Sequence, residues 1–241
     1  MKRYGGIALF FFTLLLMSVL SILQGTNARE KLALAGSLPS GNAPVNCAPA
    51  DVPCLALTFD LDPGADNVPT LLSILKEHHV KATFFVTGQW LSSHQSEAKA
   101  IADGGHELGN HTENHPDMTS LNEKAQTEEL TLLHSEVLQL TGVSMTLFRP
   151  PYDRWDNSII QNASKNGYRT IGWSIDCLDW KDYSASDIVS SVCENDSLRN
   201  GSIILLHGGA RHTADALAPM ITSLRENGYQ FSTVSRLLES R

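Results

Sequence analysis

Two histidines four residues apart, His111 and His115, are the part of this sequence best suited to hold a metal ion. One helical turn would bring both imidazoles to the same face, where a single ion could take both as ligands. Close pairs also arise by chance among nine histidines, and residues 77–79 read as a solvated helix end with such a pair. The motif therefore indicates a metal only if other parts of the chain supply further ligands.

Asp60 and Asp62 place two carboxylates on one side of an extended segment. Asp62 and the two histidines would make three protein ligands, which leaves a position for water as in catalytic zinc sites. Such an ion would polarise a carbonyl and lower the pKa of its water, and Asp60 is placed to take the proton. The alternative for Asp62 is a common Asx-turn with the proline and glycine that follow it.

Arg149 and His207 complete the candidate chemistry. Arg149 follows an apolar stretch, and if it is buried it needs a carboxylate partner, for which Asp60 is the natural choice. Such a pair would keep Asp60 ionised. His207 also follows an apolar run and could donate a proton to a leaving group, oriented by Asp176 or Asp179. The alternatives are a surface salt bridge for Arg149 and a satisfied core histidine for His207.

These residues fall just after successive predicted strands. Strands are predicted at residues 55–60, 81–86, 106–110, 145–149, 169–175, 202–206 and 229–234. Helices are predicted at residues 68–79, 93–102, 122–140, 158–166, 185–194 and 213–227. The alternation favours a parallel sheet with helices outside it, either a barrel or a doubly wound sheet. Function collects at the carboxyl ends of strands in barrels, so we expect these side chains to form one site.

The N-terminus predicts export. Residues 1–4 form a basic lead, and residues 7–23 are apolar apart from three hydroxyl side chains. This pattern is typical of a signal peptide or signal anchor over residues 1–28, followed by a linker at 29–53 and one domain at 54–241. We expect a secreted or periplasmic protein, or one tethered to the outer face of the cytoplasmic membrane through its N-terminal segment alone. The net charge of −8 argues against nucleic acid as a partner.

Four cysteines, Cys47, Cys54, Cys177 and Cys193, fit an oxidising compartment. Three connectivities can join them, and we favour the local disulfides Cys47–Cys54 and Cys177–Cys193. Because no C-x-x-C spacing occurs, metal binding by these residues is disfavoured.

Five short motifs make the sequence similar to a known family. The motifs are Leu57-Thr58-Phe59-Asp60, His111-Thr112-Glu113-Asn114-His115, Arg149-Pro150-Pro151-Tyr152, Asp176-Cys177-Leu178-Asp179-Trp180 and Leu205-Leu206-His207. Over roughly residues 55–234 the chain resembles the polysaccharide deacetylases with a NodB-homology domain, carbohydrate esterase family 4. One motif alone is weak, but five in the family's order, each at a predicted strand end, are a specific signal.

The resemblance implies an α/β fold, a distorted (β/α) barrel of about seven strands, TIM-barrel-like, in a single domain. It implies metal-dependent hydrolysis of the N-acetyl group of N-acetylglucosamine-type residues in an extracytoplasmic polymer: peptidoglycan, a chitin-like glycan or another exported polysaccharide. The metal at His111 and His115 would be zinc above all, with cobalt, nickel or manganese as alternatives. Asp60 would be the general base with Arg149 as its partner.

The remaining motifs carry further implied roles. His207 would be the general acid, tuned by Asp179. The backbone N–H of Tyr152 would stabilise the oxyanion, as preorganised donors do elsewhere. Trp180 and Leu205 would line the pocket for the acetyl group.

The first motif departs from the family's commonest form, in which a second aspartate directly follows the first and binds the metal. Leu61 stands there instead. A minority of relatives carry D-x-D with the later aspartate as ligand, and the segment from Asp60 to Asp62 resembles that form. Those relatives include peptidoglycan deacetylases and some enzymes acting on cyclic amides. Two other functions therefore stay open: a non-catalytic glycan-binding module, and an amidohydrolase for small non-sugar amides. Nothing in the sequence indicates an oligomeric state.

Overall fold

The computed structural model of the protein describes residues 43–49 and 54–239. The predicted signal segment and most of the predicted linker lie outside these residues. Among the helices of the described part, none is both long and apolar enough to cross a bilayer.

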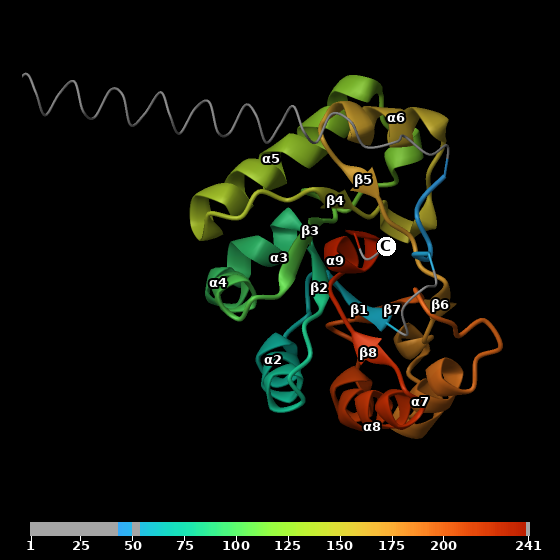
Figure 1. Cartoon of the computed structure of the whole chain (residues 1–241). Helices are drawn as coiled ribbons and strands as arrows, with labels where there is room; N and C mark the ends of the chain where they lie inside the picture. The colour runs from blue at the N-terminus through green and yellow to red at the C-terminus, as the bar shows by residue number, and fades with distance from the viewer. Residues whose placement is uncertain (1–42, 50–53, 240–241) are drawn as a thin grey trace, which may run out of the picture. The chain divides into compact units, whose positions relative to one another are not determined.

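A curled parallel sheet forms the centre of the domain (Figure 1). Its strands are β1 (Cys54–Leu61), β2 (Thr83–Val86), β3 (Glu107–Asn110), β4 (Leu147–Phe148), β5 (Arg169–Thr170), β6 (Ile175–Asp176), β7 (Ile203–His207) and β8 (Gln230–Phe231). The order is β5-β4-β3-β2-β1-β7-β6, and β8 pairs with β1. β1 is buried along its whole length, as its nearly continuous apolar sequence requires of a central parallel strand. The predicted distorted (β/α) barrel is confirmed.

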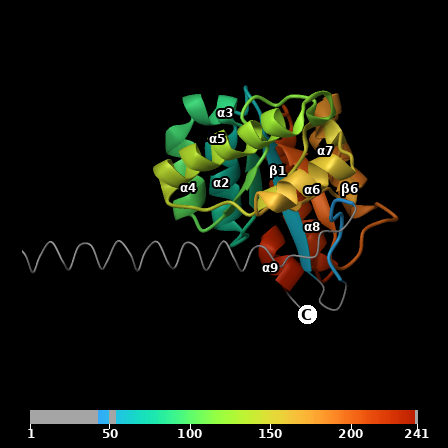
Figure 2. The ribbon, with the colours of Figure 1, turned by 90° about the horizontal axis from the view of Figure 1, so that it is seen from above.

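Helices pack against this sheet (Figures 1 and 2). They are α2 (Val68–Glu77), α3 (Gly88–Ser93), α4 (Gln95–Asp103), α5 (Glu123–Thr141), α6 (Asn157–Lys165), α7 (Ala185–Cys193), α8 (Thr213–Glu226) and α9 (Val234–Glu239), with short 3₁₀ turns η1 (Met118–Ser120), η2 (Pro151–Asp153) and η3 (Asp179–Lys181). Local signals set their ends: the Asn122 side chain accepts the Ala125 N–H to start α5, and Gly142 ends it at φ +74°. The predicted helices are all present, and α3 was not predicted.

One predicted strand is divided in the structure. Residues 169–175 were expected to form a single strand, but they form β5, which pairs with β4, and β6, which pairs with β7. β5 and β6 are the two ends of the strand order, so one continuous strand could not serve both partners. The chain crosses between them at Ile171-Gly172-Trp173-Ser174.

The C-terminal segment also differs from the prediction. The strand expected at 229–234 is only β8, and α9 follows it inside the curl of the sheet (Figure 1). Val234 and Leu237 of α9 belong to an inner apolar cluster with Phe85, Ile171 and Ile203. A larger cluster lies between the sheet and the outer helices. The short helix therefore fills the interior of the barrel, which the pattern of a half-buried strand did not reveal.

Part of the predicted linker is built into the domain. Val45 forms a parallel bridge with Ile171, just after β5, and Cys47 forms an antiparallel bridge with Ser202, just before β7. The segment thus links the β5 end of the sheet to β7. The folded domain begins at least as early as residue 43, N-terminal to the predicted boundary at 54.

The predicted disulfides are wrong in this structure, in which Cys47, Cys54, Cys177 and Cys193 are all free. The backbone of residues 200–202 runs between the first pair, because Gly201 donates to the Cys54 carbonyl while Ser202 pairs with Cys47. Cys177 is fully buried at the end of β6, and burial raises its pKa far above the ordinary value. A thiol in that state is inert.

Candidate active site

The strand register brings Asp60 and His207 together. Asp60 on β1 lies opposite His207 on β7 and opposite Phe85 on β2. Register partners in a parallel sheet point to the same face, so these side chains face the barrel interior at the carboxyl end of the strands. Leu61, the next residue, points the other way and is buried in the outer core. The alternation that makes Asp60 and Asp62 share a side thus holds in the structure.

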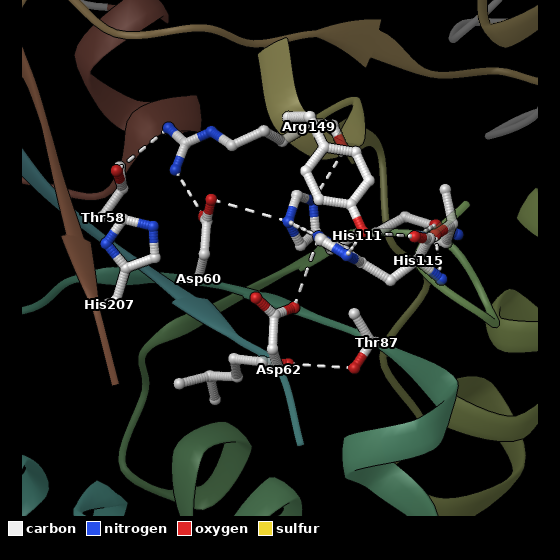
Figure 3. A network of polar contacts seen from close by, with 12 residues as sticks. Thr58, Asp60, Asp62, Thr87, His111, His115, Arg149 and His207 are labelled. Atoms are coloured by element: carbon white, nitrogen blue, oxygen red, sulfur yellow. Dashed lines mark hydrogen bonds and ion pairs between the residues drawn. The ribbon is translucent and has the colours of Figure 1, made fainter. Parts of the chain in front are cut away.

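Three side chains could hold a metal ion. Asp62, His111 and His115 each offer a ligand atom, and these atoms all lie within 4.8 Å of one another. The Nε2 atoms of the two imidazoles are 3.2 Å apart, and the His115 Nε2 lies 3.5 Å from Asp62 Oδ1 (Figure 3). The predicted set is therefore assembled at one point, beside Asp60.

The hydrogen bonds of this set fit a cation. His111 Nδ1 lies 2.8 Å from the Arg149 carbonyl, which can only accept, so Nδ1 carries a proton, and in the neutral ring Nε2 is the bare nitrogen. The buried Asp62 Oδ1 has no hydrogen-bond partner, a costly condition for a carboxylate. Burial and His111 lower the pKa of His115 more than the Asp62 and Asp60 carboxylates raise it, which favours the neutral imidazole that metals bind. An aspartate and two histidines with converging lone pairs suit zinc.

The histidine motif is a loop and not the helical turn that was expected. Thr112 and His115 have positive φ angles of 71° and 54°. The buried Asn110 side chain accepts the Thr112 N–H at 2.8 Å, and Thr112 Oγ1 accepts the His115 N–H at 3.0 Å. These bonds hold the two residues in a left-handed backbone conformation that is disfavoured for residues other than glycine. The two imidazoles therefore converge through loop geometry.

Arg149 and Asp60 form a buried ion pair, as predicted, so the surface alternative is wrong. Arg149 is fully buried, and its Nη1 lies 2.6 Å from Asp60 Oδ1. Its Nη2 donates to Thr58 Oγ1 at 3.0 Å and to the Gly172 carbonyl at 3.1 Å. Burial raises the pKa of Asp60, but the charges of Arg149, His111 and His207 and the Arg149 hydrogen bond outweigh it, and the net shift is downward. Asp60 is therefore an ionised carboxylate. Figure 3 shows its contact with Arg149.

His207 is held by Asp179, and the open choice between Asp176 and Asp179 is resolved. Asp179 Oδ1 accepts from His207 Nδ1 at 2.8 Å, and Oδ2 accepts the His207 backbone N–H at 2.8 Å. Asp176 instead accepts from the Leu178 N–H and, at 3.4 Å, from Trp180 Nε1. Burial lowers the pKa of His207, but the Asp179 hydrogen bond and nearby carboxylates raise it by more. The net shift is upward, so the ring is more basic than usual.

The predicted substrate-binding residues occupy different environments. Tyr152 in η2 is 63% exposed, yet its hydroxyl lies 3.0 Å from His115 Nδ1. Trp180 in η3 is 56% exposed beside Asp179. Leu205 is buried in β7, two residues before His207 and on the same face of the strand.

Three further residues support the site and were not predicted. Thr58 bonds Arg149, Asn110 fixes the turn at Thr112, and Thr213 Oγ1 donates to Asp179 Oδ2 at 2.6 Å. Each is a fully buried polar residue. In the sequence the only available signal was a polar residue inside an apolar strand, which marks Thr58 but not the other two.

Comparisons with known proteins agree on one family. Residues 48–171 match the family model described as polysaccharide deacetylase. The chain is 33% identical over 215 residues to a peptidoglycan-N-acetylglucosamine deacetylase of Bacillus cereus, covering 88% of this chain and 74% of that protein. It is 33% identical over 190 residues to the peptidoglycan-N-acetylmuramic acid deacetylase PdaA of Bacillus subtilis, covering 76% and 70%. A further relative, 34% identical, is longer, and this chain spans 58% of its length.

A solved structure adds a contrast. BA3943 from Bacillus anthracis, described as a CE4 family pseudoenzyme, matches with a TM-score of 0.78 and 31% identity over 82% of this chain and 69% of that chain. A mutant of BA3943 is described as having restored enzymatic activity. The same fold therefore occurs with and without activity, so the fold alone does not show whether a protein is active. The residues at the site are needed to distinguish an enzyme from a pseudoenzyme.

Proposed function

The chain belongs to the polysaccharide deacetylase family, and from that premise we propose that it hydrolyses the N-acetyl group of N-acetylglucosamine-type residues in an extracytoplasmic amino-sugar polymer, peptidoglycan first. Relatives named for N-acetylglucosamine and for N-acetylmuramic acid deacetylation both support peptidoglycan as the substrate class. The single observation that carries the proposal is the convergence of Asp62, His111 and His115 beside the ionised Asp60.

Asp62, His111 and His115 would hold a divalent ion, zinc before cobalt, nickel or manganese. The chemistry supplied by such an ion is polarisation of the amide carbonyl and acidification of a water. Asp62 would take the place of the aspartate that most family members carry one position earlier. Its unpartnered Oδ1, facing the two imidazoles, supports that assignment.

The protein's own side chains divide the proton transfers. Asp60, kept ionised by Arg149, would take a proton from the attacking water while the water oxygen bonds to the amide carbon. The backbone N–H of Tyr152 would donate to the developing oxyanion. His207, made more basic by Asp179, would give its proton to the nitrogen as the C–N bond breaks. The products are acetate and a free amine, with Trp180 and Leu205 proposed around the acetyl methyl.

A second candidate function is a non-catalytic glycan-binding module. The likeness to the pseudoenzyme BA3943 favours it. The intact set of Asp60, Arg149, Asp179 and His207 opposes it, because a module that only binds has no use for a positioned acid and base.

Acetate release tests the proposal. The full chain should release acetate from N-acetylglucosamine oligomers and from peptidoglycan, should lose that activity to a chelator, and should regain it with zinc or cobalt. Cyclic imides should be poor substrates. Glycan binding without acetate release, in a protein shown to contain zinc, would establish the binding module instead. Faster turnover of cyclic imides than of acetylated sugars would establish an amidohydrolase.

The pH profile should depend on Asp179. Because His207 acts as an acid only when protonated, activity is expected to fall as the pH rises through its raised pKa. In Asp179→Asn the main hydrogen bond that raises this pKa is weakened, so the alkaline limb of the kcat profile should move to lower pH. Asp182→Asn is a matched control, since Asp182 is an exposed aspartate three residues away that pairs with Arg211. An alkaline limb in Asp179→Asn that coincides with the control would exclude this role for His207.

A further inference from the structure

The two imidazoles of the proposed metal site are oriented by different kinds of group. His111 Nδ1 donates to the backbone carbonyl of Arg149, which no side-chain substitution removes. His115 Nδ1 has the phenolic oxygen of Tyr152 as its partner, at 3.0 Å. One of the two orientations therefore depends on a single replaceable side chain.

The phenol decides which nitrogen of His115 carries a proton. The Tyr152 hydroxyl has one hydrogen and lies 3.2 Å from the His115 carbonyl oxygen, which can only accept, and 3.0 Å from His115 Nδ1. Both contacts can be hydrogen bonds at once only if the phenol donates to the carbonyl and accepts from Nδ1–H. Nε2 is left bare, and it is the atom that faces His111 Nε2 and Asp62 Oδ1.

Burial does not explain the position of the Tyr152 ring. Tyr152 is 63% exposed, so burial contributes little to holding it there. Its backbone has a φ of +60° and the following Asp153 a φ of +53°, a pair of left-handed residues that costs free energy. The ring meets the His115 ring edge-on, with centroids 4.6 Å apart. Both polar contacts of the hydroxyl go to His115.

We propose that the Tyr152 phenol is a positioning residue for the metal site: it holds His115 in the Nδ1–H tautomer and aims Nε2 at the ion. The inference rests on the proposed function, since it needs a metal at that site, and it adds a side-chain role to the backbone role given to Tyr152 above. Groups that orient a metal-binding histidine in this way typically change metal affinity by 10–100-fold when they are removed.

Tyr152→Phe tests the side chain while keeping the ring and the backbone N–H. We expect zinc to bind about 10–100-fold more weakly, measured by competition with a chromophoric chelator. In the metal-free protein, ¹⁵N shifts of the His115 ring should change from one dominant tautomer to a mixture. Tyr183→Phe is the control, because Tyr183 is another exposed tyrosine, and it should change neither quantity.

The outcomes separate this inference from the proposed function. Unchanged zinc affinity and unchanged His115 shifts in Tyr152→Phe, in a protein that still releases acetate, would overturn the inference alone. A wild-type chain that takes up no zinc would overturn both. Weaker zinc binding with a tautomer mixture, and an unfolding temperature equal to that of the control, would establish the positioning role, because a general loss of folding would lower that temperature.

Discussion

Replacing Asp60 with asparagine is expected to lower kcat for acetate release by about 10²–10⁴-fold, the usual contribution of a general base. The amide has the shape of the carboxylate and still offers an oxygen to Arg149 Nη1, which lies 2.6 Å from Asp60 Oδ1 in the wild type. It cannot take a proton from water. Stability should fall because Arg149 loses its buried counter-charge, but the amide keeps the hydrogen bond, so we expect a folded protein with its metal content retained. Steady-state kinetics and zinc analysis on the same preparation would measure kcat and the metal content.

Asp66→Asn supplies the comparison for that experiment. Asp66 lies on the loop that follows β1, and its 81% exposed side chain pairs with His94. We expect its kcat to stay within about twofold of wild type, as for most surface changes. Equal activity in the two variants would show that Asp60 does not act as a base, and another group would have to be sought.

The sequence predicts the central strands well and the edge of the sheet poorly. β1 appears as an unbroken apolar run because it is buried on both faces, so its pattern depends on no other part of the chain. The division of 169–175 into β5 and β6 depends instead on which partners are available at the two ends of the sheet. That information is non-local. The docking of residues 43–49 between Ile171 and Ser202 is hidden for the same reason.

The candidate site divides in a similar way. Asp60, Arg149 and His207 could be predicted to meet because each ends or follows a strand, and parallel strands end at a common edge. The loop conformation that brings the His111 and His115 side chains together could not be predicted. Positive φ values in a non-glycine loop are imposed by contacts such as the Asn110 hydrogen bond. Residue types and spacing thus identify the chemistry, whereas the supporting hydrogen bonds appear only in three dimensions.

Replacing Arg149 with methionine should cause the largest loss of stability among these variants. Arg149 is fully buried, and its removal leaves the nearly buried Asp60 carboxylate without its partner. Breaking one half of a buried pair costs about 3–5 kcal/mol in the free energy of unfolding. The pKa of Asp60 should also rise, since Arg149 is the main group that lowers it, which weakens the base function as well. The free energy of unfolding measured in urea and the kcat for acetate release should both fall.

Two further variants test whether the loss of stability comes from breaking the Asp60–Arg149 ion pair. Arg154→Met removes a 64% exposed arginine that pairs with Asp117, and we expect it to change the free energy of unfolding by about 0–1 kcal/mol. The double variant Asp60→Asn with Arg149→Met should be less destabilised than the sum of the single changes, because neither buried charge is then left alone. Strict additivity would mean that Arg149 stabilises the barrel through its contacts with Thr58 and the Gly172 carbonyl and not through Asp60. An equally small loss for Arg149→Met and Arg154→Met would mean that the buried pair adds little to stability.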